Sequence, residues 1–327
     1  MRYRRLGRTG FEVSEIGLGT WAMGGDWGTV DDATSLRALH AAADAGVTFF
    51  DTADVYGDGR SERILGRFLR ERSGQRLFVA TKIGRRAPLV QANYTQANFR
   101  AWADRCRDNL GVATLDLVQL HCLPTDTYYR PEVFDWLDDL KSTGAIAHYG
   151  VSVERVEEAL KAIELPGVDT VQIIFNLFRQ RPAELFLPRA MSKDVGVIVR
   201  VPLASGLLTG KLRADSAFEA GDHRNYNRRG EAFDVGETFS GVDFERGLEA
   251  VDALRSILPP GQPMSAWALR WILMFGGVGT VIPGAKTETQ ARANAAAADL
   301  PPLDDDAMKR LAELYRTAIA PMVHQRW

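Results

Sequence analysis

Alternation of short apolar runs with amphipathic segments is the feature that most limits how this chain can fold. Eight runs rich in Val, Ile, Leu or Phe recur, and a segment with helical spacing of its apolar residues follows each of them. Strands buried on both faces and joined by helices through short connections pair in parallel. The runs predict strands at residues 16–21, 47–53, 77–83, 115–121, 147–153, 170–176, 196–203 and 280–285.

Eight such units favour an α/β fold of the (β/α)8 TIM barrel type, for which a chain of 327 residues is long enough. An open, doubly wound sheet is the alternative, but it usually has fewer strands and a glycine-rich first turn, and no Gly-x-Gly-x-x-Gly follows Gly17. With no clear linker, we expect one domain over residues 1–327. Helices are predicted at residues 33–45, 61–71, 98–110, 131–143, 156–163, 183–193, 244–258, 265–275, 288–297 and 304–316.

Composition excludes several classes of function. The chain has 40 basic and 42 acidic residues, so no excess of positive charge favours nucleic acid or an acidic membrane as a partner. Two cysteines, Cys106 and Cys122, are too few for a disulfide framework and fit a reducing compartment. The apolar stretch 271–285 is too short for a transmembrane helix, and no signal peptide follows Met1. A cytoplasmic protein is expected.

Four polar side chains fall where the predicted strands end. Asp51, Lys82 and His121 close three successive strands, and Tyr56 lies in the loop after the first of these. Barrels of this type place their chemistry at that rim. Each residue also has a structural alternative: Asp51 as a helix cap, Tyr56 as an ordinary half-buried tyrosine, Lys82 as an ion-pair partner of Asp51, and His121 as a core histidine. His121-Cys122 lacks a second pair at metal spacing, so no metal is expected.

Together the four residues have one chemical logic. A tyrosine with a pKa of about 10 is a poor acid at neutral pH, and a nearby ammonium group lowers that pKa. A buried carboxylate keeps the ammonium charged, and a histidine hydrogen-bonds the carbonyl oxygen that the tyrosine protonates. The set therefore predicts an acid placed over a carbonyl group that receives a hydride.

With these residues and several motifs, the chain resembles the aldo-keto reductase family over essentially its whole length. The resemblance implies a (β/α)8 barrel with an N-terminal β-hairpin, residues 2–5 and 11–14, closing its bottom. It also implies reduction of aldehydes and ketones with NADPH by the tetrad of Asp51, Tyr56, Lys82 and His121, with Tyr56 as the proton donor. The matching motifs are Gly17-Leu18-Gly19-Thr20-Trp21, Asp51-Thr52-Ala53 with Tyr56-Gly57, Thr81-Lys82, Leu120-His121, Gly150-Val151-Ser152, Pro202-Leu203, Gly206-Leu207-Leu208-Thr209-Gly210-Lys211, and Ile282-Pro283-Gly284 with Asn294.

A cofactor site is implied by the same resemblance. Ser152 and Gln172 would bind the nicotinamide amide, and the segment 203–211 would wrap the pyrophosphate. Lys286 opens a predicted helix, and a cation at a helix N-terminus suits a 2′-phosphate, which favours NADPH over NADH. The alternative is that Lys286 only decorates a surface turn. The implied cofactor residues are Thr20, Trp21, Asp51, Ser152, Gln172, Arg200, Pro202, Leu203, Ser205, Gly206, Leu207, Lys211, Gly284, Lys286, Gln290 and Asn294.

Three positions depart from the family pattern near the cofactor. Val153 stands where the family usually has Asn, Ala293 where a glutamate is common, and Arg200 where many members stack an aromatic ring on the nicotinamide. The planar guanidinium of Arg200 could stack in place of that ring. None of these positions belongs to the tetrad, so the departures concern cofactor affinity.

An aromatic rim is expected around the substrate, which suits a hydrophobic or aromatic carbonyl compound, although the same residues suit barrel packing. The irregular region 212–243 is long enough to be functional or mobile, and its Arg224, Arg228 and Arg229 either close over an anion or decorate a solvated loop. The substrate candidates are Trp21, Met23, Trp27, Tyr56, His121 and Phe178.

Taken together, these patterns predict an NADPH-dependent aldo-keto reductase that acts on a small carbonyl compound. A regulatory NADPH-binding subunit with little turnover is the alternative from another class. A phosphosugar isomerase on the same barrel gives no reason for the Tyr, Lys and Asp set. The physiological substrate, the reaction direction and the oligomeric state stay open.

Overall fold

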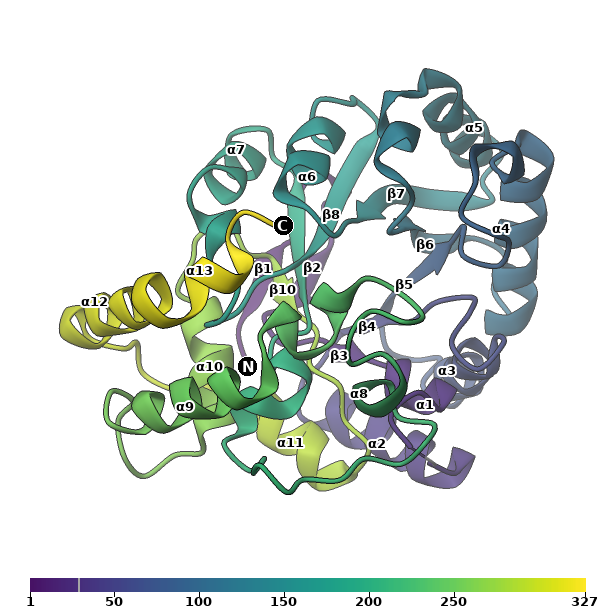
Figure 1. Ribbon diagram of the computed structural model, residues 1–327. Helices are drawn as coiled ribbons and strands as arrows, with labels where there is room; N and C mark the ends of the chain where they lie inside the picture. The colour runs from purple at the N-terminus through teal and green to yellow at the C-terminus, as the bar shows by residue number, and fades with distance from the viewer. Residues whose placement is uncertain (29) are drawn as a thin grey trace.

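The predicted strands form one parallel barrel in the computed structural model, which describes residues 1–28 and 30–327 (Figure 1). The strands pair in the order β10-β9-β8-β7-β6-β5-β4-β3. Parallel bridges between Ile16 and Val281 and between Gly19 and Gly284 join the two edges of this sheet, so the expected closure is confirmed. The strands are β3 (Leu18–Gly19), β4 (Phe49–Asp51), β5 (Phe78–Ile83), β6 (Leu115–His121), β7 (Ile146–Ser152), β8 (Val168–Ile174), β9 (Gly196–Arg200) and β10 (Thr280–Val281).

Helices surround the barrel (Figure 1). Their buried apolar residues belong to the same core cluster as those of the strands. Local signals fix several of their ends: the Asp31 side chain accepts from the backbone N–H of Thr34, and Gly111 takes a left-handed conformation after Leu110. The helices are α1 (Trp21–Gly24), α2 (Asp32–Asp44), α3 (Arg60–Glu71), α4 (Gln96–Leu110), α5 (Pro131–Ser142), α6 (Val156–Ala162), α7 (Phe186–Ser192), α8 (His223–Tyr226), α9 (Phe244–Arg255), α10 (Met264–Ile272), α11 (Glu288–Ala296), α12 (Asp305–Leu314) and α13 (Ala320–Val323).

An N-terminal hairpin closes the bottom of the barrel, as expected. Its strands β1 (Tyr3–Arg5) and β2 (Glu12–Ser14) pair antiparallel around a short 3-10 turn. Leu6 and Val13 are fully buried against residues at the starts of the barrel strands, such as Phe49 and Phe78. Gly7 lies so close to the start of β9 that a Cβ there would be 2.1 Å from the backbone nitrogen of Gly196.

Four strands are shorter than expected, among them β9, which ends at Arg200 and not at residue 203. β3, β4 and β10 have two or three residues each, and isolated bridges continue the pairing beyond them. The reason is close backbone packing, because a Cβ on Gly17 would lie 2.8 Å from the carbonyl oxygen of Phe49. The predicted helix 183–193 is also shorter, since a 3-10 turn (Arg181–Ala183) precedes α7.

The region 212–243 is not structureless. It contains α8 and two 3-10 turns, Val235–Glu237 and Phe239–Gly241, and α8 lies beside α1 near the barrel opening (Figure 1). The backbone N–H of His223 donates to the carbonyl of Asp26 at 3.0 Å, and the His223 ring packs against Trp21. Among the residues that the structure describes, no helix is long and apolar enough to cross a membrane.

Candidate active site

The barrel brings the four predicted catalytic residues together at the carboxyl ends of its strands. Asp51 ends β4, Lys82 is the penultimate residue of β5, His121 ends β6, and Tyr56 lies in the turn after β4. Parallel pairing in register places these strand ends side by side, with Asp51 opposite Ala80 and Lys82 opposite Gln119. The rim position follows from the register of the strands.

Asp51 and Lys82 form a buried ion pair, with exposed fractions of 2% and 1%. Burial acts to lower the pKa of Lys82, but Asp51 and Tyr56 together outweigh it and the pKa is raised, so the amine stays an ammonium. The other Asp51 oxygen accepts from Gln172 at 2.7 Å and from Gln119 at 3.2 Å. One oxygen of the Asp51 carboxylate therefore accepts from Lys82 and the other from the two glutamines, which fixes the orientation of the Lys82 side chain.

Tyr56 receives its hydrogen bond from this lysine. The distance from Lys82 Nζ to the Tyr56 hydroxyl is 3.3 Å. Burial raises the pKa of Tyr56 to about 12, and Lys82 opposes that shift without overcoming it. Lys82 thus lowers the pKa of Tyr56, as expected, but this effect is smaller than the rise caused by burial. Tyr56 therefore carries its proton at neutral pH.

His121 faces the tyrosine as a neutral base. The two ring centroids are 5.9 Å apart and the rings meet edge to face. Burial lowers the pKa of His121 well below its ordinary value, and Arg85 lowers it further. Its Nδ1 is buried and has no hydrogen-bond partner among the described residues. A neutral imidazole can donate one hydrogen bond to a carbonyl oxygen without competing as an acid.

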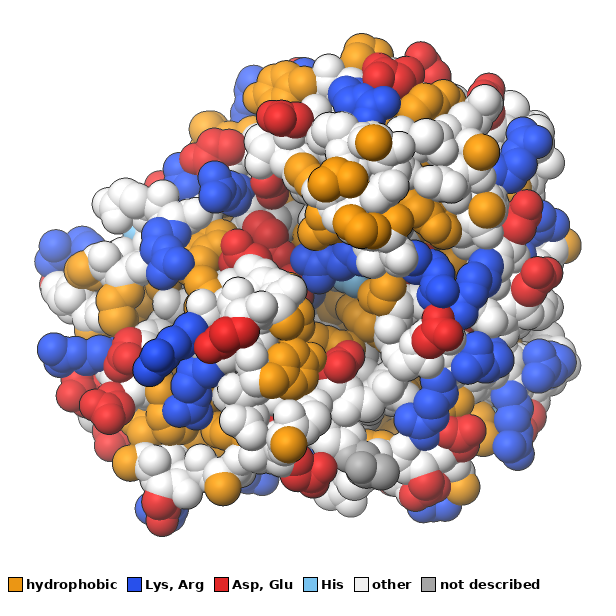
Figure 2. All heavy atoms as spheres, turned by 45° about the vertical axis from the view of Figure 1, so that its right-hand side comes forward, with side chains coloured by type: hydrophobic (Ala, Val, Ile, Leu, Met, Phe, Trp, Pro, Cys, Tyr) orange, Lys and Arg blue, Asp and Glu red, His pale blue; other side chains and the backbone are white. Residues whose placement is uncertain are grey.

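A cavity of about 580 Å³ opens above these residues. Figure 2 shows the hollow, with acidic and basic side chains around it and hydrophobic ones along its rim. Of the predicted substrate contacts, Trp21, Tyr56 and His121 line it. The other three lie elsewhere: Met23 and Phe178 are 1% exposed in the interior, and Trp27 packs on Trp21 behind the wall. The region 212–243 contributes Tyr226, Ala232, Phe233, Asp234 and Glu237 to the lining.

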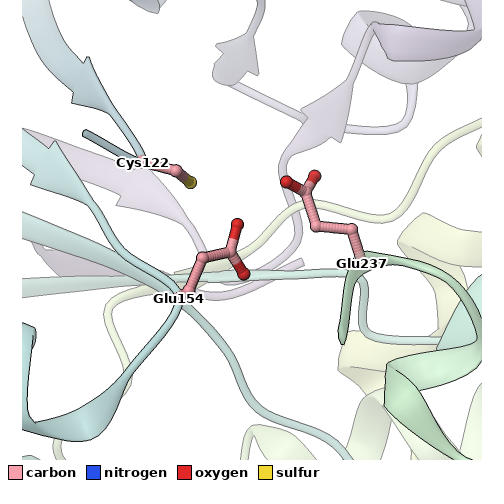
Figure 3. A group of neighbouring side chains, drawn as sticks. All are labelled: Cys122, Glu154 and Glu237. Atoms are coloured by element: carbon pink, nitrogen blue, oxygen red, sulfur yellow. The ribbon is translucent and has the colours of Figure 1, made fainter. Parts of the chain in front are cut away.

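A buried ion cluster beside the tetrad was not predicted from the sequence. Arg85 pairs with Glu237 at 3.0 Å, and Arg200 pairs with Glu154 at 2.9 Å and with Glu237 at 3.3 Å. Figure 3 shows Glu154, Glu237 and Cys122 pointing toward one another, with ligand atoms within 4.8 Å. Two guanidinium groups already face these carboxyl groups, so the cluster has no need of a metal cation.

The pKa values of the two carboxyl groups in the ion cluster are shifted in opposite directions. Burial raises the pKa of Glu154 to about 8, although Arg200 opposes the shift. Burial acts in the same direction on Glu237, but Arg85 and Arg200 outweigh it and lower the pKa of Glu237 to about 2. Glu237 is therefore the carboxylate that balances the arginines.

The predicted nicotinamide contacts surround Arg200. Ser152 ends β7 and Gln172 lies in β8, and the two residues face each other in the strand register. The Gln172 amide donates to Asp51 and to Gln119 at 3.2 Å, which leaves its carbonyl oxygen for a carboxamide donor. Arg200 also donates to the carbonyl of Val153 at 3.1 Å, so its guanidinium is held between this carbonyl and the two glutamates, and Arg200 does not belong to the described cavity lining.

The predicted phosphate end contains two cations that lie near each other. In the turn after β9, Ser205 and Gly206 have φ angles of 52° and 100°, a conformation that bends the chain sharply. Arg224 reaches this turn and donates to the carbonyl of Ser205 at 3.5 Å. Burial lowers the pKa of Lys286, and Arg224 lowers it further. Two cations that repel each other beside a left-handed turn fit an anionic group such as a cofactor phosphate.

At the adenosine end, the predicted residues hold the start of α11. Gln290 accepts from the backbone N–H of Lys286 at 2.8 Å, and Asn294 donates to the carbonyl of Gly284 at 3.1 Å. Lys286 also donates to the carbonyl of Trp27. Of the loop arginines, Arg228 packs its guanidinium over the ring of Phe244, while Arg224 pairs with Asp222 at 2.6 Å and reaches the turn at Ser205.

Comparisons with known proteins agree with this geometry. The model of the aldo/keto reductase family matches residues 15–316. The aldo-keto reductase YhdN of Bacillus subtilis is 31% identical over 300 residues, which cover 90% of this chain and 87% of the relative. A probable voltage-gated potassium channel subunit beta from Oryza sativa is 30% identical over 325 residues, 93% of each chain.

Among solved structures, the glycerol dehydrogenase of Gluconobacter oxydans superposes with a TM-score of 0.79. It is 31% identical, and the match covers 98% of this chain and 96% of the other. The family match covers most of the chain, and the barrel, the hairpin and the grouped Asp, Tyr, Lys and His side chains are all present. The chain therefore belongs to the aldo/keto reductase family.

Proposed function

We propose that this protein reduces aldehydes or ketones to alcohols with NADPH, and that Tyr56 is the proton donor. The observation that carries the proposal is the chain of contacts from Asp51 through Lys82 to the Tyr56 hydroxyl, at the floor of a cavity. When bound, a nicotinamide dinucleotide supplies the hydride.

Each residue of the tetrad has a separate task. Tyr56 donates its proton to the carbonyl oxygen, and Lys82 stabilises the phenolate that remains, since its ammonium lies 3.3 Å from the hydroxyl. Asp51 keeps Lys82 charged and pointed at Tyr56. Neutral His121 donates a hydrogen bond to the same carbonyl oxygen and orients it. Because the tetrad is buried and little water screens it, the electrostatic interactions between these side chains are stronger than they would be in water.

Preference for NADPH over NADH rests on Lys286 and Arg224. The two side chains lie close enough that Arg224 lowers the pKa of Lys286. A dianionic 2′-phosphate would relieve this repulsion, whereas a ribose hydroxyl would not. The proposal also places the protein in the cytoplasm and takes residues 1–327 as one domain.

Replacement of Tyr56 by Phe tests the mechanism. We expect kcat for aldehyde reduction to fall roughly 100-fold to 10,000-fold, because a positioned general acid contributes about that much. Affinity for NADPH should stay within about twofold, because the hydroxyl does not face the phosphate end. Purified protein is assayed by carbonyl-dependent oxidation of NADPH and by a fluorescence titration with NADP⁺.

A matched control removes another buried tyrosine hydroxyl. The hydroxyl of Tyr94 has no hydrogen-bond partner among the described residues, and Tyr94 does not belong to the described cavity lining. Tyr94→Phe should therefore keep most of the turnover. Turnover in Tyr56→Phe that stays near the wild-type level would remove the role given to Tyr56.

A second candidate is a regulatory subunit that binds NADPH and turns over little substrate. The similarity to the rice potassium channel subunit beta supports it. The grouped tetrad and the open cavity favour the enzyme. A protein that holds NADPH tightly through purification but oxidises it with no carbonyl compound would favour the regulatory role.

A further inference from the structure

The segment 234–241 forms part of the cavity wall and carries one residue of the ion cluster. Asp234 and Glu237 line the cavity, and Figure 3 shows the Glu237 side chain reaching from this segment into the cluster. Glu237 pairs with Arg85 at 3.0 Å and with Arg200 at 3.3 Å. The position of the segment therefore decides whether the two buried guanidinium groups keep this carboxylate as a partner.

The backbone of the segment has a conformation that needs support. Phe239 and Ser240 have φ angles of 52° and 59°, in the left-handed region that residues other than glycine rarely adopt. Such residues persist where the surrounding structure holds them in place. The Ser205 hydroxyl gives one support, because it donates to the carbonyl of Glu237 at 3.1 Å and accepts from the backbone N–H of Phe239 at 3.0 Å. A second support comes from Trp327.

Trp327 contacts the segment near both of its ends. Its indole N–H donates to a carboxyl oxygen of Asp234 at 2.9 Å. A Cβ on Gly236 would lie 2.8 Å from Cε2 of the ring, and a Cβ on Gly241 would lie 2.5 Å from Cη2, so the ring packs directly on the backbone at these two positions. Trp327 is 3% exposed and does not belong to the described cavity lining. The ring therefore supports the wall from outside the cavity.

Two arginines hold the Trp327 ring in turn. The guanidinium groups of Arg179 and Arg326 lie over the ring, at 4.3 Å and 4.2 Å from its centroid. Arg179 is 4% exposed, and it also donates to the carbonyl of Ser240 at 3.4 Å. Arg179 therefore connects the ring to the left-handed backbone of the segment.

This support bears on the chemistry because Glu237 acts on the tetrad. Burial raises the pKa of Tyr56, and the Glu237 carboxylate adds to that rise. Burial lowers the pKa of His121, and Arg85, the partner of Glu237, adds to that fall. A shift of Glu237 away from Arg85 therefore changes the electrostatic field at both catalytic side chains.

We propose that Trp327 is a positioning residue of the active site, which holds the segment 234–241 against the barrel rim so that Glu237 stays paired with Arg85 and Arg200. The inference rests on the proposed reductase function and adds to it a residue that lies outside the cavity. Glu237 is the group through which the effect of Trp327 reaches the tetrad.

Trp327→Leu removes the ring and the indole N–H but keeps an apolar side chain. With propanal and NADPH, we expect kcat to fall about tenfold or more, because small displacements around reacting groups are costly, while KM for propanal stays within about twofold. In a Glu237→Gln background the same substitution should lower kcat by less than about twofold, because the ionic pairing that it disturbs is already lost. Equal losses in the two backgrounds, or a loss confined to KM, overturn the proposal.

A matched control removes another buried indole. Trp102 is 8% exposed, packs on Phe99 in α4 and does not belong to the described cavity lining. Trp102→Leu should keep kcat within about twofold. Hydrogen exchange, measured by mass spectrometry, should be about tenfold faster over residues 234–241 in Trp327→Leu and unchanged there in Trp102→Leu. An equal loss of kcat in the control, or unchanged exchange of the segment in Trp327→Leu, overturns the proposal.

Failure of the positioning role and failure of the reductase function give different results. Wild-type turnover of propanal that Trp327→Leu retains rejects the role of Trp327 and keeps the reductase. Absence of NADPH oxidation by the wild-type protein with every aldehyde rejects both. If Trp327→Leu does not fold, as judged by circular dichroism, Gly236→Ala decides, because its Cβ meets the same ring. Its kcat should fall about tenfold or more, and a kcat at the wild-type level overturns the proposal.

Discussion

Asp54 lies in the turn that carries Tyr56, and replacing it by Asn should stabilise the protein, relative to the wild type, more at high pH than at low pH. Asp54 is fully buried, and neither carboxyl oxygen has a hydrogen-bond partner among the described residues. Arg86 and Arg105 are near, but both donate to the backbone carbonyl of Asp54 and to the side chain of Asp58. Burial raises the pKa of Asp54 from 3.8 to about 7, and Glu62 adds to the shift.

The size and sign of the effect follow from this shift. Between pH 3.8 and about 7 the folded protein keeps a proton on Asp54 that the unfolded chain has released. The folded state then binds more protons, so the free energy of unfolding falls as pH rises through that window. Of this window, about two pH units lie between pH 5 and pH 7. Each pH unit lowers the free energy of unfolding by about 1.4 kcal/mol, so the wild-type protein loses about 3 kcal/mol of stability.

Urea unfolding at pH 5 and at pH 8 measures this loss. Asn carries no charge at either pH, so the free energy of unfolding of Asp54→Asn minus that of the wild type should rise by about 3 kcal/mol from pH 5 to pH 8. Asp58→Asn is the matched control. Arg86 lowers the pKa of Asp58 below 3.8, so its carboxyl group is ionised in the folded and the unfolded protein at both pH values, and the difference between Asp58→Asn and the wild type should stay flat from pH 5 to pH 8. A difference for Asp54→Asn that is flat or falls with pH would refute the reasoning.

Two further substitutions test the phosphate end and the packing under Tyr56. Lys286→Met should weaken NADP⁺ binding roughly tenfold or more and leave NAD⁺ binding within about twofold, because only the 2′-phosphate interacts with the cation. Tryptophan fluorescence measures both affinities, and equal losses for the two dinucleotides would contradict this prediction. A Cβ on Gly24 would lie 2.8 Å from the backbone of Tyr56 and of Gly57, so Gly24→Ala should lower kcat about tenfold or more. Gly74→Ala, whose Cβ meets no atom within 4 Å, is its control, and wild-type turnover in Gly24→Ala would show that the turn tolerates the shift.

Much of the fold follows from the sequence because its signals are local and repeated. Apolar runs and helical spacing recur in every unit, and the hairpin, all eight strands and the parallel pairing are confirmed. Strand ends are less well predicted, because the lengths of β3 and β10 depend on how closely Gly17 and Gly19 approach neighbouring backbone. That distance is set by how the barrel closes, and the sequence around these glycines does not predict it.

The grouping of the tetrad could be predicted for a similar reason. In a parallel barrel every strand ends at the same rim, so Asp51, Lys82 and His121 needed only to be placed at strand ends. The protonation of Tyr56 could not be predicted in the same way. Whether Lys82 or burial dominates its pKa depends on how much water reaches the hydroxyl, and that depends on side chains from several loops.

The ion cluster shows where sequence reasoning stops. Its arginines and glutamates come from the ends of β5, β7 and β9 and from the region 212–243, and each resembles an ordinary surface charge in its own segment. Burial of any one of these charged side chains alone would be unfavourable, so the four are stable inside the protein only as a set of mutual partners. Such a set appears only once the long loop is placed against the rim. The same placement adds Asp234 and Glu237 to the lining of a cavity for which the sequence predicted an aromatic rim.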